Sequence, residues 1–96
     1  MTQTPGFIAV YRWKIAEENV AAFRECWRAA TRELGPHGIR GSLFARADDG
    51  TFCAIALWPD RETRDRAFAD VPGREWPPVE RLEPILLSPL DNLWKL

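Results

Sequence analysis

The amino-acid sequence predicts an α+β domain in which two helices cover one face of a four-stranded antiparallel sheet. The chain has 96 residues, the length of one small domain, and we expect residues 1–96 to form a single unit. Four short apolar segments have the composition of strands, and two longer segments repeat apolar residues at the spacing of a helix. The segments follow one another in the order strand, helix, strand, strand, helix, strand.

The first strand and the first helix have clear patterns. Residues 7–15, FIAVYRWKI, are rich in β-branched and aromatic side chains and predict a strand. Residues 16–35 predict a helix, because apolar side chains recur along them at steps of three and four residues. Gly35 and Pro36 are expected to end this helix. Its apolar stripe consists of Val20, Phe23, Trp27, Ala30 and Leu34.

A β-hairpin is predicted after the first helix. Two strand-like runs, residues 39–46 and 51–58, flank the sequence ADDG. Within it, Asp49 and Gly50 are residue types that tolerate positive φ angles, as a tight turn requires. The two runs are therefore expected to pair as neighbouring antiparallel strands.

The remaining helix and strand complete the order of elements. Residues 59–71 predict a short helix, for which Asp60 is a suitable N-cap. Residues 80–90 predict the last strand, at an edge of the sheet because Pro84 has no N–H to donate to a ladder. The resulting βαββαβ order is that of the ferredoxin-like fold, with both helices on one face of the sheet.

Both faces of the third predicted strand are apolar, which predicts a homodimer. A sheet with one solvated face alternates apolar and polar side chains, and this strand does not. Two helices can cover only one face, so a second copy of the chain is the simplest partner for the other. The C-terminal Trp94 packs either across that partner or over its own sheet. One strand face carries Phe52, Ala54, Ala56 and Trp58, and the other carries Cys53, Ile55 and Leu57.

Composition and charge argue against several classes of partner. The net charge of −1 gives no reason to expect nucleic acid or an anionic membrane surface. No apolar run approaches the roughly 20 residues of a membrane span, and residues 1–6 lack the pattern of a secretory signal. Cys26 and Cys53 do not form a familiar metal-ligand spacing with His37, the single histidine. We therefore expect a cytoplasmic protein with reduced, buried cysteines and no metal or other cofactor.

Most of the chain resembles a known family. The quoted segments are FIAVYRWKI, a helix carrying VAAFRECWRAATRE, and GIRGSLFARADDGTFCAIALWPDRETRDRAF. Together they resemble the antibiotic biosynthesis monooxygenase domain, within the dimeric α/β barrel superfamily, from residue 7 to about residue 71. The resemblance implies that two protomers pack their sheets into a shared barrel with the helices outside. This agrees with the two apolar faces of the third strand.

The resemblance also implies a class of activity. Some members oxidise small aromatic, polyketide-like molecules with dioxygen and no cofactor, and others degrade haem. The haem-degrading members use an asparagine, a tryptophan and a histidine, whose matching positions here are Tyr11, Ala67 or Phe68, and the loop near Trp76. Because none of these three residue types is found at its matching position, the resemblance does not imply haem degradation by that mechanism. Tyr11 and Trp76 are left as candidates for altered roles in a similar pocket.

Two residues are candidates for catalysis. His37 is the first candidate, because histidine is the residue type most often used as a general base, here for a phenolic proton. The alternative is a solvated turn residue. Tyr11, central in the first strand, could orient a ligand or transfer a proton, or serve as a core tyrosine. The candidate substrate-binding residues, each of which could instead be plain core, are Trp13, Trp58, Phe68 and Trp76.

The leading functional hypothesis is therefore a cofactor-independent monooxygenase acting on a hydrophobic, aromatic small molecule. His37 or Tyr11 would remove a proton in an apolar pocket, and the substrate anion would react with dioxygen. This rests on a resemblance of fold, and function belongs to sites rather than folds. Two alternatives stay open: a non-catalytic dimer that binds a small molecule or another protein, and a haem-binding protein with His37 as axial ligand.

Overall fold

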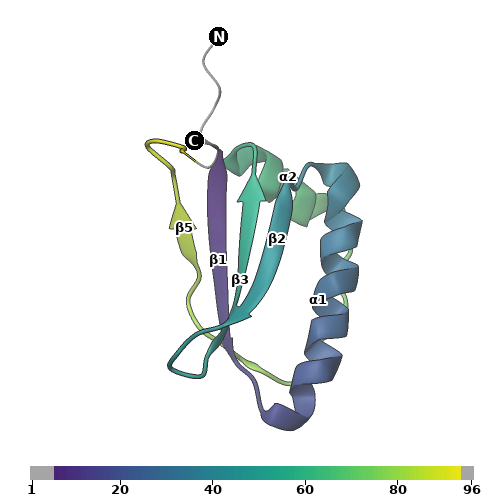
Figure 1. Cartoon of the computed structure of the whole chain (residues 1–96). Coiled ribbons are helices and arrows are strands. Elements are labelled where there is room, and N and C mark those ends of the chain that lie inside the picture. The colour runs from purple at the N-terminus through teal and green to yellow at the C-terminus, as the bar shows by residue number, and fades with distance from the viewer. Residues whose placement is uncertain (1–5, 94–96) are drawn as a thin grey trace.

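The structure is a computed structural model that describes residues 6–93, and its elements follow the predicted order (Figure 1). Four of the first five predicted elements differ from the observed ones by at most two residues at either end. The first helix was predicted over residues 16–35, but the α-helix begins only at Val20, after a 3₁₀ turn. Two 3₁₀ turns, η1 and η2, flank the first helix. The elements are β1 (Phe7–Lys14), η1 (Glu17–Asn19), α1 (Val20–Leu34), η2 (Gly35–His37), β2 (Gly41–Arg46), β3 (Phe52–Trp58), α2 (Arg61–Asp70), β4 (Glu80–Arg81) and β5 (Ile85–Leu87).

The sheet is antiparallel, and β1 lies in its interior. Strand β3 separates β2 from β1, while β4 and β5 both pair with the other side of β1. Figure 1 shows this order from β5 through β1 and β3 to β2. In the register of β1 with β3, Tyr11 lies opposite Ala54 and Phe7 lies opposite Trp58. This order confirms the ferredoxin-like α+β fold.

The last strand differs from the prediction. The sequence predicts one continuous strand over residues 80–90, whereas the structure has two short strands, β4 and β5, so the sheet formed by residues 6–93 contains five strands. The Leu82 N–H still donates to the carbonyl oxygen of Arg12 at 3.0 Å, and pairing then stops until Ile85. Pro84 lies in this break, because a residue without an N–H cannot continue the ladder.

Local side-chain chemistry explains how α2 and the hairpin begin. Asp60 is the N-cap of α2, and its Oδ1 accepts a hydrogen bond from the Thr63 N–H at 2.7 Å, as predicted. In the β2–β3 turn, Gly50 has a φ of 89°, a region that favours glycine. Hydrogen bonds between Ala47 and Thr51 and from Gly50 to Ala47 close this turn.

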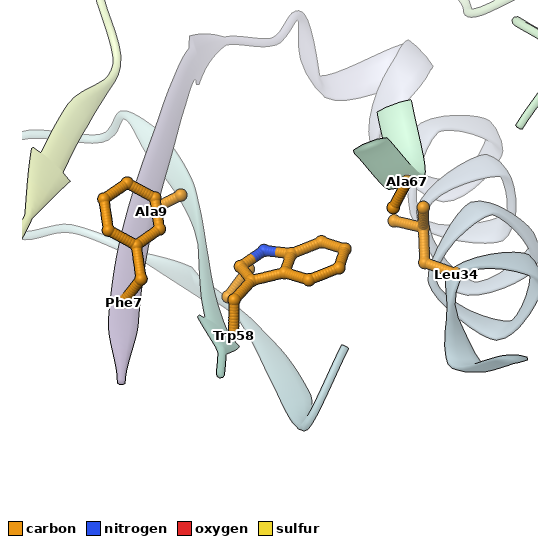
Figure 2. Close-up of a cluster of buried hydrophobic side chains, with 6 residues drawn as sticks. Phe7, Ala9, Leu34, Trp58 and Ala67 are labelled. Atoms are coloured by element: carbon orange, nitrogen blue, oxygen red, sulfur yellow. The ribbon is translucent and has the colours of Figure 1, made fainter. Parts of the chain in front are cut away.

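The core lies between the sheet and the two helices. Side chains at alternate positions of β1 and β3 point toward the helices and are buried there, as the two-residue period of a strand dictates. Trp58 is 0% exposed and projects from β3 toward Leu34 of α1 and Ala67 of α2 (Figure 2). This cluster consists of Phe7, Ala9, Leu34, Ala56, Trp58 and Ala67.

The opposite face of the sheet carries apolar side chains that no described element covers. These positions alternate with the core positions along β1, β2, β3 and β5. Exposed large residues on this face are Leu43, Ile55, Ile85 and Leu87. The pattern from which a second protomer was inferred is therefore present in the fold.

Two other expectations concern the cysteines and the C-terminal tail. Cys26 and Cys53 are both free, but each is partly exposed rather than buried. Cys53 belongs to the uncovered face of β3, and Cys26 lies on α1 with its Sγ 3.7 Å from the carbonyl oxygen of Glu75. Trp94, for which two packing alternatives were open, lies outside the described residues.

Candidate functional site

A cavity of about 470 Å³ lies between the helix-facing side of the sheet and the two helices. Small-molecule sites usually have volumes of about 300–1,000 Å³ and mostly apolar walls with a few polar groups. This cavity, called here the sheet–helix cavity, has such walls, and its aromatic lining comes from Tyr11, Trp13, Trp27, Trp58, Phe68 and Trp76.

Five separate parts of the chain supply these aromatic rings, and Trp27 comes from α1. Tyr11 and Trp13 are two residues apart on β1 and therefore share its helix-facing side. Trp58 ends β3, and Phe68 comes from α2. Trp76 lies in the loop that follows α2. The structure thus brings together Tyr11 and all four residues predicted to bind substrate.

The polar centre of the cavity is a contact between Tyr11 and Arg64. The Tyr11 hydroxyl oxygen accepts hydrogen bonds from Nε and Nη2 of Arg64, both at 3.1 Å. Because a guanidinium has donors and no acceptor, the hydroxyl hydrogen of Tyr11 is not used by Arg64. The hydrogen can therefore be donated to an oxygen of a ligand.

Arg64 is held in place from three sides. Its Nη1 donates to Oδ1 of Asp65 at 2.8 Å, and its Cζ lies 4.8 Å from the centre of the Phe68 ring. The same carbon lies 5.9 Å from the centre of the Tyr11 ring. The Arg64 side chain is only 18% exposed, so its charge is screened by solvent less than that of an arginine on the surface. The cavity wall therefore carries an oriented positive charge.

Burial raises the pKa of the Tyr11 hydroxyl above its ordinary value of 10.0. The hydrogen bond and the charge of Arg64 act in the opposite direction but do not cancel the effect of burial. Tyr11 is consequently a neutral phenol at neutral pH. It can donate a hydrogen bond, and it is a poor general base, because a base would have to be the phenolate.

The charged residues of the cavity lining share one sign. Arg12, Arg64 and Arg81 line the cavity, and none of the described lining residues is an aspartate or glutamate. The Nη2 of Arg12 donates to the Glu83 carbonyl oxygen at 3.4 Å. A lining of this kind favours a ligand with hydrogen-bond acceptors or negative charge.

His37 lies elsewhere. It is the exposed last residue of η2, between α1 and β2, and it does not line the sheet–helix cavity. It lines instead an open hollow of about 360 Å³ with Glu33, Arg74 and residues 71–73. Arg74 forms an ion pair with Glu33 there. The structure therefore separates the two residues proposed for catalysis.

Sequence reasoning missed Arg64 and assigned Trp27 to the core alone. Trp27 belongs to the predicted apolar stripe of α1 but is partly exposed and lines the cavity. Arg64 is four residues before Phe68 and three before the buried Ala67, so these residues share a helix face. That spacing is the signal that could have identified Arg64.

The structure also bears on metal binding and on membrane spanning. Among residues 6–93, no group of three or more histidine, cysteine, aspartate or glutamate side chains is placed to hold a metal ion. Within the same residues, no helix is both long and apolar enough to cross a membrane.

Comparison with known proteins supports the fold. No family model matches the chain, and no curated protein matches it. Among solved structures, it is similar to that of Rv0793 from Mycobacterium tuberculosis, with a TM-score of 0.52 and 19% sequence identity. The match covers 91% of this chain and 97% of that one. At this identity the similarity concerns the fold and not the activity.

Proposed function

We propose that the protein is a cytoplasmic, cofactor-independent monooxygenase of the antibiotic biosynthesis monooxygenase type, acting on a hydrophobic, aromatic small molecule. The observation that carries this proposal is the Tyr11 hydroxyl, held by Arg64 in an otherwise mostly apolar, aromatic cavity. The free cysteines are consistent with a reducing compartment.

The cavity supplies binding and charge stabilisation for such a reaction. The aromatic walls hold a planar substrate, and the Tyr11 hydroxyl donates to a substrate oxygen. When the substrate loses a proton to bulk water, negative charge develops on that oxygen, where Tyr11 and the Arg64 charge stabilise it. The anion then reacts with dioxygen. For an anthrone, a CH₂ group becomes C=O, one oxygen atom enters the product, and the other leaves as water.

Of the two catalytic candidates, the geometry favours Tyr11 over His37. Tyr11 lines the cavity, whereas His37 is exposed beside a different hollow. In this proposal Tyr11 acts as a hydrogen-bond donor rather than a base, because its pKa is raised. His37 is assigned no role in the reaction.

Oxygen uptake tests this function. The purified, metal-free protein should consume dioxygen with anthrones or hydroquinones faster than the uncatalysed reaction. Tyr11→Phe should lower turnover by about 10²-fold, the effect of losing one donor to a developing oxyanion. His37→Ala is the control and should keep wild-type turnover. Wild-type rates in Tyr11→Phe, with loss in His37→Ala, would reverse the assignment of the two residues.

A non-catalytic small-molecule-binding protein is the second candidate. The observation in its favour is that the described lining of the cavity includes no histidine and no carboxylate that could act as a base. Saturable binding of the same aromatic compounds, with no oxygen uptake for any of them, would favour this alternative.

We also propose that the protein is a homodimer joined through the uncovered sheet face. Leu43 and Ile55 are exposed on this face, on adjacent strands and directly opposite each other. Contiguous exposed apolar side chains are typical of protein interfaces. In this arrangement the sheet–helix cavity of each protomer stays on the far side of its sheet, away from the interface.

Replacing Ile55 with lysine should convert the dimer to a monomer, because the change places a charge in the centre of the apolar face. Leu90→Lys is the matched control, since Leu90 is exposed but lies outside the sheet. Sedimentation velocity at micromolar concentration measures the state, and circular dichroism verifies folding. A monomeric wild-type protein would refute this interface.

A further inference from the structure

Trp58 has a buried hydrogen-bond donor without an acceptor. The residue is 0% exposed, and its Nε1–H finds no hydrogen-bond partner among the described residues. Most buried polar groups are paired, and each exception calls for an explanation. Apolar contacts do not need this N–H, and burying it without an acceptor costs free energy, so packing alone does not account for the unpaired donor.

The location of Trp58 supplies an explanation. It lines the sheet–helix cavity, and its ring centre lies 5.9 Å from that of Phe68, which in turn lies 6.2 Å from Tyr11. In Figure 2, β1 runs upward from Phe7 to Ala9 and beyond. The Trp58 nitrogen, drawn in blue, lies on the upper edge of its ring, the edge toward which β1 continues. Tyr11 lies farther along β1 in that direction. The unpaired donor is therefore on the same side of the ring as the polar centre of the cavity.

We propose that the indole N–H of Trp58 is a second recognition point, and that the ligand is an aromatic molecule with two separate oxygen acceptors. One oxygen binds at Tyr11 and Arg64, and the other, a carbonyl or similar acceptor, accepts from Trp58. The inference rests on the sheet–helix cavity being the ligand site of the proposed function. It narrows the ligand from an aromatic molecule with one oxygen at Tyr11 to one that carries a second oxygen acceptor, such as a hydroxyaryl ketone.

The cost of leaving the Trp58 N–H unpaired should make the protein prefer ligands with two oxygen acceptors over ligands with one. A ligand with one oxygen leaves the Trp58 N–H buried and unpaired, as it is without a ligand. A ligand with a second acceptor pairs it and gains affinity from that bond. The preference should depend on the N–H of Trp58 and not on its aromatic ring.

The experiment compares matched probes without turnover. We would measure anaerobic binding of 6-acetyl-2-naphthol and 7-acetyl-2-naphthol, each against its ethyl counterpart, by calorimetry. The wild-type protein should bind at least one acetyl probe about tenfold more tightly than its ethyl counterpart. Trp58→Phe should abolish this ratio. Trp27→Phe, the same change at another tryptophan of the cavity lining, should preserve it.

The ratio compares two probes on one protein, so a loss of stability in Trp58→Phe affects both probes equally. Should that variant not fold, infrared spectroscopy of the wild-type complex gives the answer. A hydrogen bond from Trp58 lowers the carbonyl stretching frequency of the bound acetyl probe relative to an aprotic solvent.

Equal affinities for acetyl and ethyl probes, or a ratio that survives in Trp58→Phe, would overturn the inference. So would an unshifted carbonyl frequency. Binding selectivity without oxygen uptake would leave the second recognition point standing and reject the oxygenase. Oxygen uptake with no acetyl preference would support the oxygenase and reject the second recognition point.

Discussion

Replacing Phe23 with alanine should lower the free energy of unfolding by about 3–5 kcal/mol, the usual cost of truncating a fully buried phenylalanine. Phe23 is 1% exposed. Its ring centre lies 4.8 Å from that of Trp13 and 5.0 Å from that of Trp76. Phe44 is a third ring neighbour, at 5.7 Å. Removing the ring would leave a cavity among these aromatic side chains.

Chemical denaturation monitored by circular dichroism measures this loss. Phe68→Ala is the control, because Phe68 is 43% exposed although it contacts Tyr11 and Trp58. Phe68→Ala should lower the free energy of unfolding clearly less than Phe23→Ala does. It should weaken ligand binding more, because Phe68 lines the sheet–helix cavity and Phe23 does not. A loss below about 1 kcal/mol in Phe23→Ala would show that the aromatic cluster re-packs around the space.

The fold could be predicted because its elements have strong periodic patterns. The stripe from Val20 to Leu34 has the helical spacing, and the alternation in β1 and β3 fixes which side chains face the helices. The break in the last strand was not predicted, although Pro84 marks it. Proline was taken as a sign of an edge strand, whereas the ladder stops there and resumes at Ile85.

The site was only partly predictable, for reasons of geometry. Alternation along β1 places Tyr11 and Trp13 on one face, so their shared position follows from the sequence. Whether rings leave a cavity or fill it depends on their packing in three dimensions, which periodicity does not encode. Arg64 illustrates a second limit. A charged residue on a short helix is normally solvated, and its turn toward the Tyr11 hydroxyl is a tertiary contact.

His37 shows the risk of judging a residue by its chemistry alone. A single histidine attracts attention because histidine is a residue type that often acts as an acid or base in catalysis. Its predicted place between the first helix and the next strand is confirmed, since it ends η2. That same place puts it outside the lining of the sheet–helix cavity. Topology thus separates an attractive functional group from the site.

Replacing Arg64 with methionine should raise the pKa of Tyr11 further and lower turnover by about 10²-fold. Arg64 donates two hydrogen bonds to the Tyr11 oxygen, and both these bonds and its charge favour the phenolate. Methionine keeps an apolar chain of similar length but removes the donors and the charge. Tyr11 is the single tyrosine of the chain, so ultraviolet absorbance follows its ionisation directly.

The sign of the pH effect separates this role from a structural one. Tyr11 donates a hydrogen bond only while it is protonated, so activity should fall as pH rises through its raised pKa, above 10.0. In Arg64→Met that alkaline decline should move to higher pH, although the maximal rate is lower. Arg64→Lys keeps the positive charge but loses the paired N–H donors. Its Tyr11 pKa and its maximal rate should therefore lie between those of the wild-type protein and of Arg64→Met.

Arg61→Met provides the matched control. Arg61 lies one turn earlier on α2 and pairs with the same Asp65 at 3.8 Å, yet it is exposed and does not line the cavity. Its replacement should leave both the Tyr11 titration and the rate unchanged. An Arg64→Met protein with the wild-type Tyr11 pKa, or an equal loss in Arg61→Met, would mean that Arg64 does not tune the phenol. The Tyr11 titration gives this answer with no substrate present, so it is independent of whether the correct substrate has been found.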